Sequence, residues 1–374
     1  MRTRFLAIAT AAAVAVSGAA APAAFAEAPP RTLVNNESFN KDEFKYKFDL
    51  PTAKPQDVIL QVGETQDSVR LNWITAPNIS GQTVRLDNQL RLVQKAQDGG
   101  IAAVWVRDIP LRVETFGDVG QVYDPWMYLS YLAAHTTSIA LGTAAIVVPF
   151  QHPLLLAKRA ATIDRLSGGR FLMGVATGDR PEEFPAFGMD KGIRAEVFRE
   201  HVHAYRRATT TSHKPLRWEV AGHGFKMGGS DVVPKPTARE VPLLATGSCQ
   251  QTLQWRAEHT HGWFMYHKGL DVQRVNVANW NAAVAEWAAR EGVEGPAAFK
   301  PFAESLWLDL STDPDEPASG GTFGYRLGRN TLIQLLKSQR SMGIHHVSVN
   351  FRTSTRPAEE QIDELIEHVV PALR

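Results

Sequence analysis

An alternation of strand-like and helix-like segments runs through most of the chain and limits the folds that it can adopt. Apolar runs rich in Val, Ile and Leu are each followed by a run with apolar residues at helical spacing, from 69–75 and 84–98 through to 345–351 and 358–370. There are about eight such strand–helix units, and this repetition is typical of parallel strands. The pattern predicts an α/β fold of the (β/α)8 TIM barrel type.

An open, doubly wound sheet is the alternative fold. It would use fewer strands and would have a glycine-rich turn after its first strand, whereas residues 74–77 read Ile-Thr-Ala-Pro. The barrel is therefore preferred. Residues 212–237 lie between the fourth and fifth units and read as an inserted loop or hairpin. Long loops often cover the active-site end of a barrel, so this insertion is a candidate lid.

The N-terminal residues differ in composition from the rest. Residues 1–4 are basic, residues 5–24 are apolar and alanine-rich, and small residues at Ala24 and Ala26 follow. This predicts a signal-peptide-like leader over 1–26 and an exported protein, periplasmic or secreted, with a cytoplasmic protein as the alternative. Residues 27–67, rich in Pro, Asn, Asp and Lys, read as a linker or N-terminal arm, and 68–374 as the barrel.

Charge and cysteine content exclude several classes of partner. The 40 Lys and Arg residues nearly balance the 39 Asp and Glu residues, so no net positive field would attract nucleic acid. Cys249 is the only cysteine, which excludes an intramolecular disulfide and a cysteine-based zinc site. His201 and His203 are two residues apart in a predicted helix and point away from each other. No catalytic metal is predicted.

In a barrel, functional groups gather where strands end. The run Gly247-Ser248-Cys249 leads from a predicted strand toward a helix, where free backbone N–H groups and a hydroxyl can hold a phosphate; an ordinary serine helix cap is the alternative. Thr177-Gly178 ends the fourth strand with small residues that would let a planar ring approach, although a tight turn explains them equally well.

Two charged groups are further candidates. Arg107 and Asp108 close the second strand and could steer a substrate or handle a proton, with a structural ion pair as the alternative. The carboxylates Asp179, Glu182, Glu183 and Asp309 near other strand ends would suit a glycosidase-like pair if they came together.

An ordered series of motifs resembles the luciferase-like monooxygenase family. It consists of IALGT at 139–143 with His152-Pro153 after it, LSGGR at 166–170, GVATG at 174–178 and ATGS at 245–248. The resemblance extends over roughly residues 69–372. It implies a barrel with reduced FMN, or alternatively the deazaflavin F420, at the carboxyl ends of its strands.

The resemblance also implies roles for individual residues. Gly247, Ser248 and Cys249 would surround the cofactor phosphate, and Thr177 and Gly178 would flank the isoalloxazine ring.

Thr143 and Ala144 would line the ring face, where some family members have a non-proline cis peptide. Bacterial luciferases carry a histidine soon after the second strand, and this chain has Arg107 and Asp108 there, which become the catalytic candidates.

The resemblance implies an oxidoreductase, a monooxygenase that uses reduced FMN and O2 on a small organic substrate. A separate flavin reductase and a second copy of the chain, in a homodimer, are the expected protein partners. The alternative reaction for an enzyme of this family is F420-dependent hydride transfer. A non-catalytic flavin-binding exported barrel and a glycosidase-like hydrolase are the alternatives from other functional classes.

Overall fold

The computed structural model describes residues 57–62, 69–74, 84–113, 116, 123–210, 216–220, 225–238, 240–351 and 354–373. All of them belong to one compact unit, Ala53–Arg374. The expected leader, 1–26, and the expected arm up to residue 56 lie outside the described residues, so both stay predictions. Within the described residues, no helix is long and apolar enough to cross a membrane.

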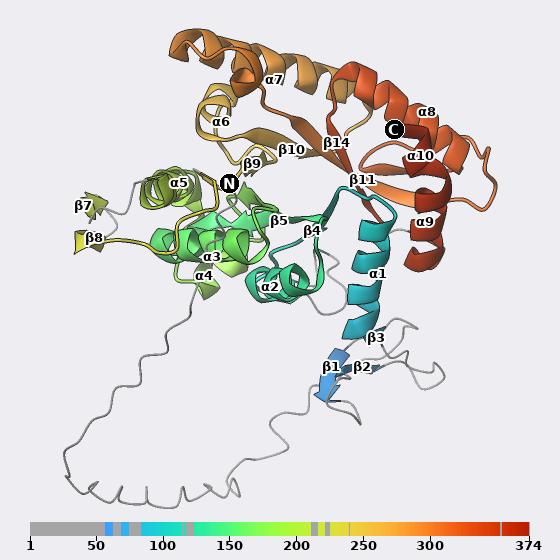
Figure 1. The fold of residues 1–374 in the computed structure, drawn as a ribbon, viewed down its shortest axis with the longest axis horizontal. Coiled ribbons are helices and arrows are strands. Elements are labelled where there is room, and N and C mark those ends of the chain that lie inside the picture. Colours follow the sequence, from blue (N-terminus) through green and yellow to red (C-terminus); the bar gives the residue numbers. More distant parts are fainter. Residues whose placement is uncertain are drawn as a thin grey trace, which may run out of the picture. The chain divides into compact units, whose positions relative to one another are not determined.

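A parallel sheet forms the centre of this unit (Figure 1). Six of its strands lie side by side in sequence order: β4 (Ala103–Val106), β5 (Ala140–Val147), β6 (Phe171–Ala176), β9 (Leu243–Thr246), β10 (Gly262–Tyr266) and β11 (Phe302–Leu310). Strand β14 (His346–Asn350) pairs in parallel with the first half of β11. Successive right-handed crossovers move the chain one place along a sheet, so repeated βα units produce this order.

Helices connect these strands, close to the ranges that the sequence predicts. They are α1 (Leu86–Asp98), α2 (Pro125–His135), α3 (Pro153–Leu166), α5 (Arg194–Thr210), α6 (Leu253–His259), α7 (Leu270–Glu291), α8 (Arg329–Met342) and α9 (Ala358–Glu364). Local signals explain their starts. Asp124 accepts hydrogen bonds from the N–H groups of Trp126 and Met127, and Pro125 occupies the first helical position. A π-helical turn, Leu365–Val369, and α10 (Val370–Leu373) extend α9.

Apolar side chains from the strands and helices form the core. Leu141 and Phe171 on the sheet and Leu129 on α2 are fully buried, and burial of each such side chain stabilises the fold by about 1.5–3 kcal/mol. Close packing also explains Gly142: a Cβ at this position would lie 2.2 Å from the ring of Trp105. Trp105 therefore requires glycine on the neighbouring strand.

The first predicted βα unit is wrong in its strand pairing. Strand β2 (Val69–Ile74) pairs antiparallel with β1 (Asp57–Val62) and with β3 (Val84–Arg85), in a separate three-stranded sheet. The sequence reading assigned 57–67 to the arm and so missed the strand that pairs with β2 along its full length.

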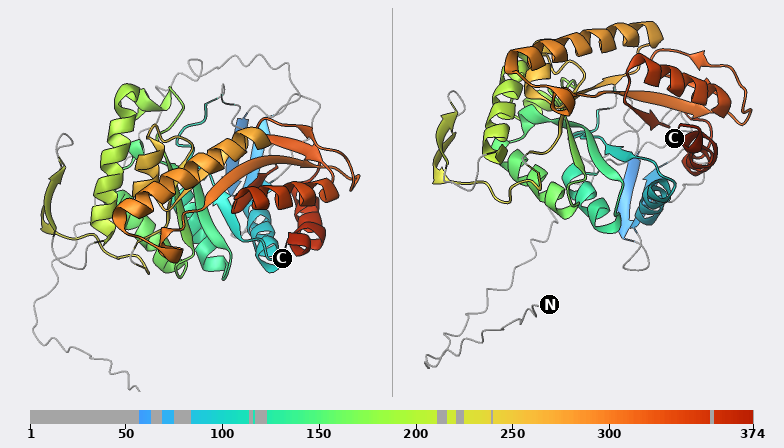
Figure 2. Two further views of the ribbon diagram at one scale, coloured as in Figure 1. Left: turned by 90° about the horizontal axis from the view of Figure 1, so that it is seen from above. Right: turned by 45° about the horizontal axis from the view of Figure 1, so that its top comes forward.

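Side chains connect the first and last strands of the parallel sheet. Trp105 on β4 donates a hydrogen bond from Nε1 to Nε2 of His346 on β14, with 2.9 Å between the nitrogens. In the helix layer, Arg91 and Lys95 of α1 form ion pairs with Glu359 of α9. Helices α1 and α9 accordingly lie side by side (Figures 1 and 2). The two ends of the βα series are therefore in contact.

The predicted insertion contains a hairpin, as expected, but it is not a lid. Strands β7 (Leu216–Val220) and β8 (Phe225–Ser230) pair antiparallel. Beyond the hairpin, Lys235 donates to the carbonyl of Ala208 near the end of α5, and the Thr237 N–H donates to Asp164 near the end of α3. Because helices return antiparallel to the strands, these helix ends lie at the amino-terminal ends of the strands. The insertion thus lies on the opposite side from the strands' carboxyl ends.

Candidate active site

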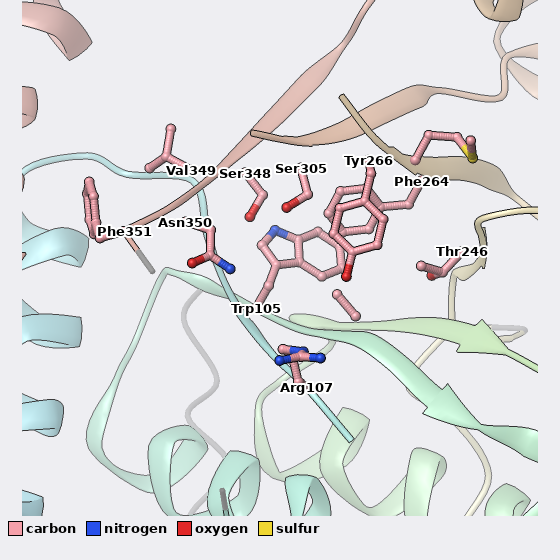
Figure 3. A pocket seen from close by; sticks show the side chains of 12 residues that line it. Trp105, Arg107, Thr246, Phe264, Tyr266, Ser305, Ser348, Val349, Asn350 and Phe351 are labelled. Atoms are coloured by element: carbon pink, nitrogen blue, oxygen red, sulfur yellow. The ribbon is translucent and has the colours of Figure 1, made fainter. Parts of the chain in front are cut away.

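A cavity of about 300 Å³ lies at the carboxyl ends of the parallel strands. Figure 3 shows it from close by, with Arg107 on one side and Ser305, Ser348 and Asn350 on the other. Side chains from β4, β5, β9, β10, β11 and β14 converge here because parallel strands end at the same edge of the sheet. The lining residues are Trp105, Arg107, Ala144, Thr246, Phe264, Met265, Tyr266, Ser305, Ser348, Val349, Asn350 and Phe351.

The lining combines aromatic rings with a few polar groups. Arg107 is the one charged side chain among these lining residues, and no carboxylate is among them. This composition suits a planar ligand that carries partial or full negative charge. It argues against the glycosidase-like alternative, because none of the candidates Asp179, Glu182, Glu183 and Asp309 lines the cavity.

Trp105 contacts an aromatic ring on one side and a neutral imidazole on the other. The rings of Trp105 and Phe264 have their centroids 4.8 Å apart. Trp105 donates to Nε2 of His346, so this nitrogen carries no proton, and burial lowers the pKa of His346. The imidazole is therefore held neutral beneath the ring-lined space.

The turn that follows β9, where the phosphate site is predicted, has open space beside its backbone. Gly247 has φ +66°, and a Cβ there would meet nothing within 4 Å, so open space adjoins its backbone. Its carbonyl accepts hydrogen bonds from Trp263 Nε1 at 2.7 Å and Arg256 Nη1 at 3.2 Å, which fix the turn. Ser248 is exposed, and its Oγ accepts from the Gln250 N–H at 3.2 Å.

The side chain of Cys249 points away from the turn, so only its backbone can take the predicted place beside a phosphate. Its thiol is buried and donates to the carbonyls of Val175 and Thr246, both at 3.2 Å, because φ +46° turns the side chain into the core. Burial raises the pKa of Cys249 to about 12. The thiol cannot surround a phosphate, so only the backbone of Cys249 remains available.

The helix after this turn starts later than expected. Helix α6 begins at Leu253, and Thr252 is its N-cap, with Oγ1 accepting from the Trp255 N–H at 3.1 Å. Ser248 is therefore not the helix cap, which removes the alternative reading of this residue. Any anion at Ser248 would be held by the turn and not by the helix end.

A buried hydroxyl group in the cavity wall lacks a partner. Thr246 lines the cavity, and within the described part of the chain its Oγ1 is buried without a hydrogen bond. Orphaned buried polar atoms are rare in folded proteins and often mark a ligand site. This orphaned hydroxyl and the open space at Gly247 are neighbouring features of the cavity wall and of the turn that follows it.

Strand β5 brings one of its two predicted residues to the cavity. Ala144 lines it, and the peptide bond between Ala144 and Ala145 is cis, as the resemblance implied for some family members. The pairing of β5 with β6 shifts register between Thr143 and Ile146. Thr143 itself is buried and donates to the Gly174 carbonyl at 2.9 Å, so its predicted contact with a ring is wrong.

The Thr177-Gly178 pair does not line the cavity either. Thr177 is buried, and Gly178 has φ +82° with Val147 Cγ1 only 2.9 Å from where a Cβ would lie. Phe184 packs at the same place, 3.2 Å from that position. Glycine is required here for a packed turn, which was the alternative reading.

Arg107 and Asp108 have different surroundings. Arg107 lines the cavity, whereas the Asp108 side chain accepts a hydrogen bond at Oδ2 from the Val147 N–H at 3.0 Å. Burial raises the pKa of Asp108 to about 6. Asp108 therefore connects the ends of β4 and β5, and it is not among the residues that line the cavity.

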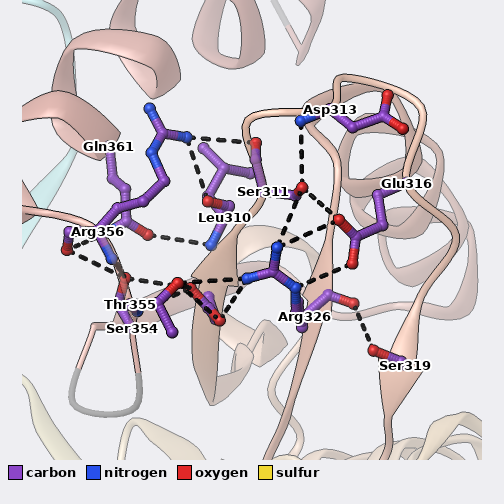
Figure 4. Close-up of polar contacts among 11 residues, drawn as sticks. Leu310, Ser311, Asp313, Glu316, Ser319, Arg326, Ser354, Thr355, Arg356 and Gln361 are labelled. Carbon is purple, nitrogen blue, oxygen red and sulfur yellow. Dashed lines mark hydrogen bonds and ion pairs between the residues drawn. The ribbon is translucent and has the colours of Figure 1, made fainter.

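A polar network secures the chain that follows β14 (Figure 4). Arg326 on β13 (Gly324–Leu327) forms ion pairs with Asp309 at 2.8 Å and Glu316 at 2.9 Å. Asp309 also accepts from the backbone N–H and the Oγ1 of Thr355, both at 3.0 Å. The network ties residues 354–356 to the end of β11, just beyond the cavity-lining end of β14.

Most of the residues that line the cavity were not predicted from the sequence. Phe264 and Tyr266 on β10, and Ser348 and Asn350 on β14, alternate along predicted strands. Alternation at the carboxyl end of a barrel strand marks residues that point inward, and this was the available signal.

Comparisons with known proteins agree with this architecture. The sequence profile of the luciferase-like monooxygenase family matches residues 70–301. An uncharacterised protein of Mycobacterium tuberculosis is 32% identical over 196 residues, which cover 50% of this chain and 66% of that protein, just under two thirds of its length. The oxygenase component of a flavin-dependent trigonelline monooxygenase from Acinetobacter baylyi is 32% identical over 122 residues, 32% of each chain. An F420-dependent secondary alcohol dehydrogenase, solved with an F420-acetone adduct, has a TM-score of 0.63 at 18% identity, covering 77% of this chain and 95% of that one.

Proposed function

Because the chain belongs to the luciferase-like monooxygenase family, we propose that it is an oxidoreductase whose cofactor binds at the carboxyl ends of the parallel strands. We assign reduced FMN as this cofactor and a small organic molecule as the substrate, which makes the chain a monooxygenase. The flavin dependence of the trigonelline monooxygenase supports the choice of FMN.

One observation carries the proposal: the ring-lined cavity adjoins a turn with open space at Gly247 and an exposed hydroxyl at Ser248. A flavin nucleotide has a planar ring system at one end and a phosphate at the other. The cavity offers Trp105 and Phe264 for the ring, and the turn offers a hydroxyl and backbone groups for the phosphate.

The residues of the chain then have separate tasks. Ser248 donates a hydrogen bond to a phosphate oxygen, and Thr246 forms part of the cavity wall beside the ring system. Arg107 favours negative charge in the cavity. When bound, the reduced flavin supplies the electrons for oxygen chemistry, and the aromatic walls exclude water from it.

Titration of reduced and oxidised FMN and F420 into the full-length chain tests this proposal. We expect micromolar binding of FMN, and Ser248→Ala should weaken it about tenfold or more, because a hydrogen bond to a charged group contributes about 1.5–3 kcal/mol. Ser341→Ala is the matched control, since Ser341 is exposed on α8, where it donates only to the Lys337 carbonyl.

Tighter binding of F420 than of FMN would indicate that the chain is an F420-dependent hydride-transfer enzyme and not a monooxygenase. Failure of both cofactors to bind would contradict the proposal.

We also propose a partner protein and a location for the chain. A separate reductase would supply reduced flavin. The name "oxygenase component" of the Acinetobacter relative supports this partner. The basic and alanine-rich start of the sequence supports export. Sequencing the N-terminus of the protein from its native host tests export: a start after residue 26 would support it, and an intact Met1 would contradict it.

A further inference from the structure

Three aromatic side chains lie in contact at one side of the cavity, and the proposed cofactor site does not use all of them. Tyr266 lines the cavity, and its ring meets that of Phe323 edge to face, with centroids 5.8 Å apart. Phe323 in turn stacks on Trp307 at 5.1 Å. We call Tyr266, Phe323 and Trp307 the aromatic rim.

Strand register explains why the rim adjoins the cavity. Tyr266 on β10 pairs with Ser305 on β11, and Ser305 lines the cavity. Trp307 lies two residues further along β11 and so on the same face as Ser305, one step closer to the strand's carboxyl end. It pairs with Asn350, another lining residue. The rim therefore continues the cavity wall outward.

Phe323 is held in place by its backbone. Its N–H donates to the His267 carbonyl at 3.1 Å, and its carbonyl accepts from the Trp307 N–H at 2.8 Å, so it bridges the end of β10 and the middle of β11. Its φ is +71°, which is uncommon for a bulky residue. The next residue is Gly324, where a Cβ would lie 1.9 Å from the Trp307 carbonyl oxygen. Glycine at 324 permits the close approach that places the Phe323 ring on Trp307.

Two of the rings still present surface to solvent. Tyr266 is 42% exposed and Phe323 is 37% exposed. A cavity of about 300 Å³ is at the small end for a ligand site and accommodates one ring system. If the cofactor ring occupies it, the reacting molecule must lie at its mouth, against the rim.

We propose that the aromatic rim is the substrate subsite, that it selects a planar aromatic or heteroaromatic ring, and that Phe323 is a specificity-determining residue. This inference rests on the proposed function. A flat ring stacks on fixed aromatic side chains with little loss of side-chain entropy, whereas a saturated ring of the same size makes fewer close contacts.

The test compares benzyl alcohol with cyclohexylmethanol, which share a head group and a carbon count but differ in planarity. Dissociation constants are measured by ligand-observed NMR on the full-length chain, with and without saturating FMN. The wild type should bind benzyl alcohol about three- to tenfold more tightly than cyclohexylmethanol. Phe323→Leu should abolish this preference, and Phe323→Tyr should keep it.

Phe299→Leu is the matched control, because Phe299 is 57% exposed and precedes β11 at its amino-terminal side. Equal binding of the two probes by the wild type would overturn the inference. Loss of the preference in Phe299→Leu, or its retention in Phe323→Leu, would do so as well.

The FMN titration is repeated on Phe323→Leu to keep the two proposals separate. An unchanged dissociation constant for FMN together with a lost aromatic preference supports the subsite. An aromatic preference in a chain that binds neither FMN nor F420 would contradict the proposed function and leave the subsite in place.

Discussion

Burial of Asp108 makes the stability of the folded chain depend on pH. Its pKa is raised from an ordinary value of about 3.9 to about 6, mainly because the charged form loses hydration. The unfolded chain therefore loses this proton at a lower pH than the folded chain. Ionisation of Asp108 makes the folded state less stable as pH rises from about 4 through 6.

Asp108→Asn should remove this pH dependence. The amide oxygen can still accept from the Val147 N–H but does not ionise. We expect the variant to be about 2 kcal/mol more stable than the wild type at pH 7 and about equal at pH 4, as measured by urea unfolding. Asp271→Asn, at an exposed ion pair with Arg274, is the control. Equal pH profiles for Asp108→Asn and the wild type would show that burial does not perturb this carboxyl.

Gly178 allows a second test at the residue scale. Gly178→Ala should cost about 2–3 kcal/mol, since it combines a positive φ with a clash against Val147. Gly188→Ala should cost only about 1 kcal/mol, because φ is also positive there but the new methyl would meet nothing within 4 Å. Equal losses in the free energy of unfolding would contradict the packing role assigned to Gly178.

At the scale of elements, the ends of β11, β13 and β14 depend on one another through Asp309. Its carboxylate accepts hydrogen bonds from the Arg326 guanidinium and from the Thr355 N–H. Asp309 thus links β13 to the segment after β14. Arg326 is partly exposed, and ion pairs of this kind contribute little to global stability. Their effect should therefore be local.

Arg326→Met should loosen the segment after β14 without unfolding the chain. Hydrogen exchange measured by mass spectrometry should increase about tenfold at 354–357, while global stability falls by no more than about 1 kcal/mol. Arg274→Met, in an exposed pair with Asp271 on α7, is the control. Unchanged exchange at 354–357 would mean that Asp309 holds the segment without Arg326.

At the scale of the whole molecule, contact between the first and last parallel strands depends on Trp105 and His346. Trp105→Phe keeps a ring against Phe264 but leaves Nε2 of His346 without its donor, which should cost about 1–2 kcal/mol. A double-mutant cycle with His346→Leu should give a coupling energy of about 1 kcal/mol in urea unfolding. Additive effects would show that the hydrogen bond does not stabilise the contact.

Periodicity alone predicted most of the parallel strands and most helices, because apolar spacing directly reflects which face is buried. It could not predict the cavity, since that depends on strands distant in sequence: Trp105 and His346 are 241 residues apart. The inward turn of Cys249 follows from a left-handed backbone angle that no local pattern indicated. The misplaced lid was avoidable, because a hairpin between a helix and the next strand must lie at the amino-terminal side of the sheet.

The location of the cofactor can be seen in a crystal structure of the chain soaked with FMN or F420. We expect density for the ring system between Trp105 and Ala144, with the phosphate at Gly247 and Ser248. A cofactor bound elsewhere, or a cavity left empty at saturating concentration, would contradict it.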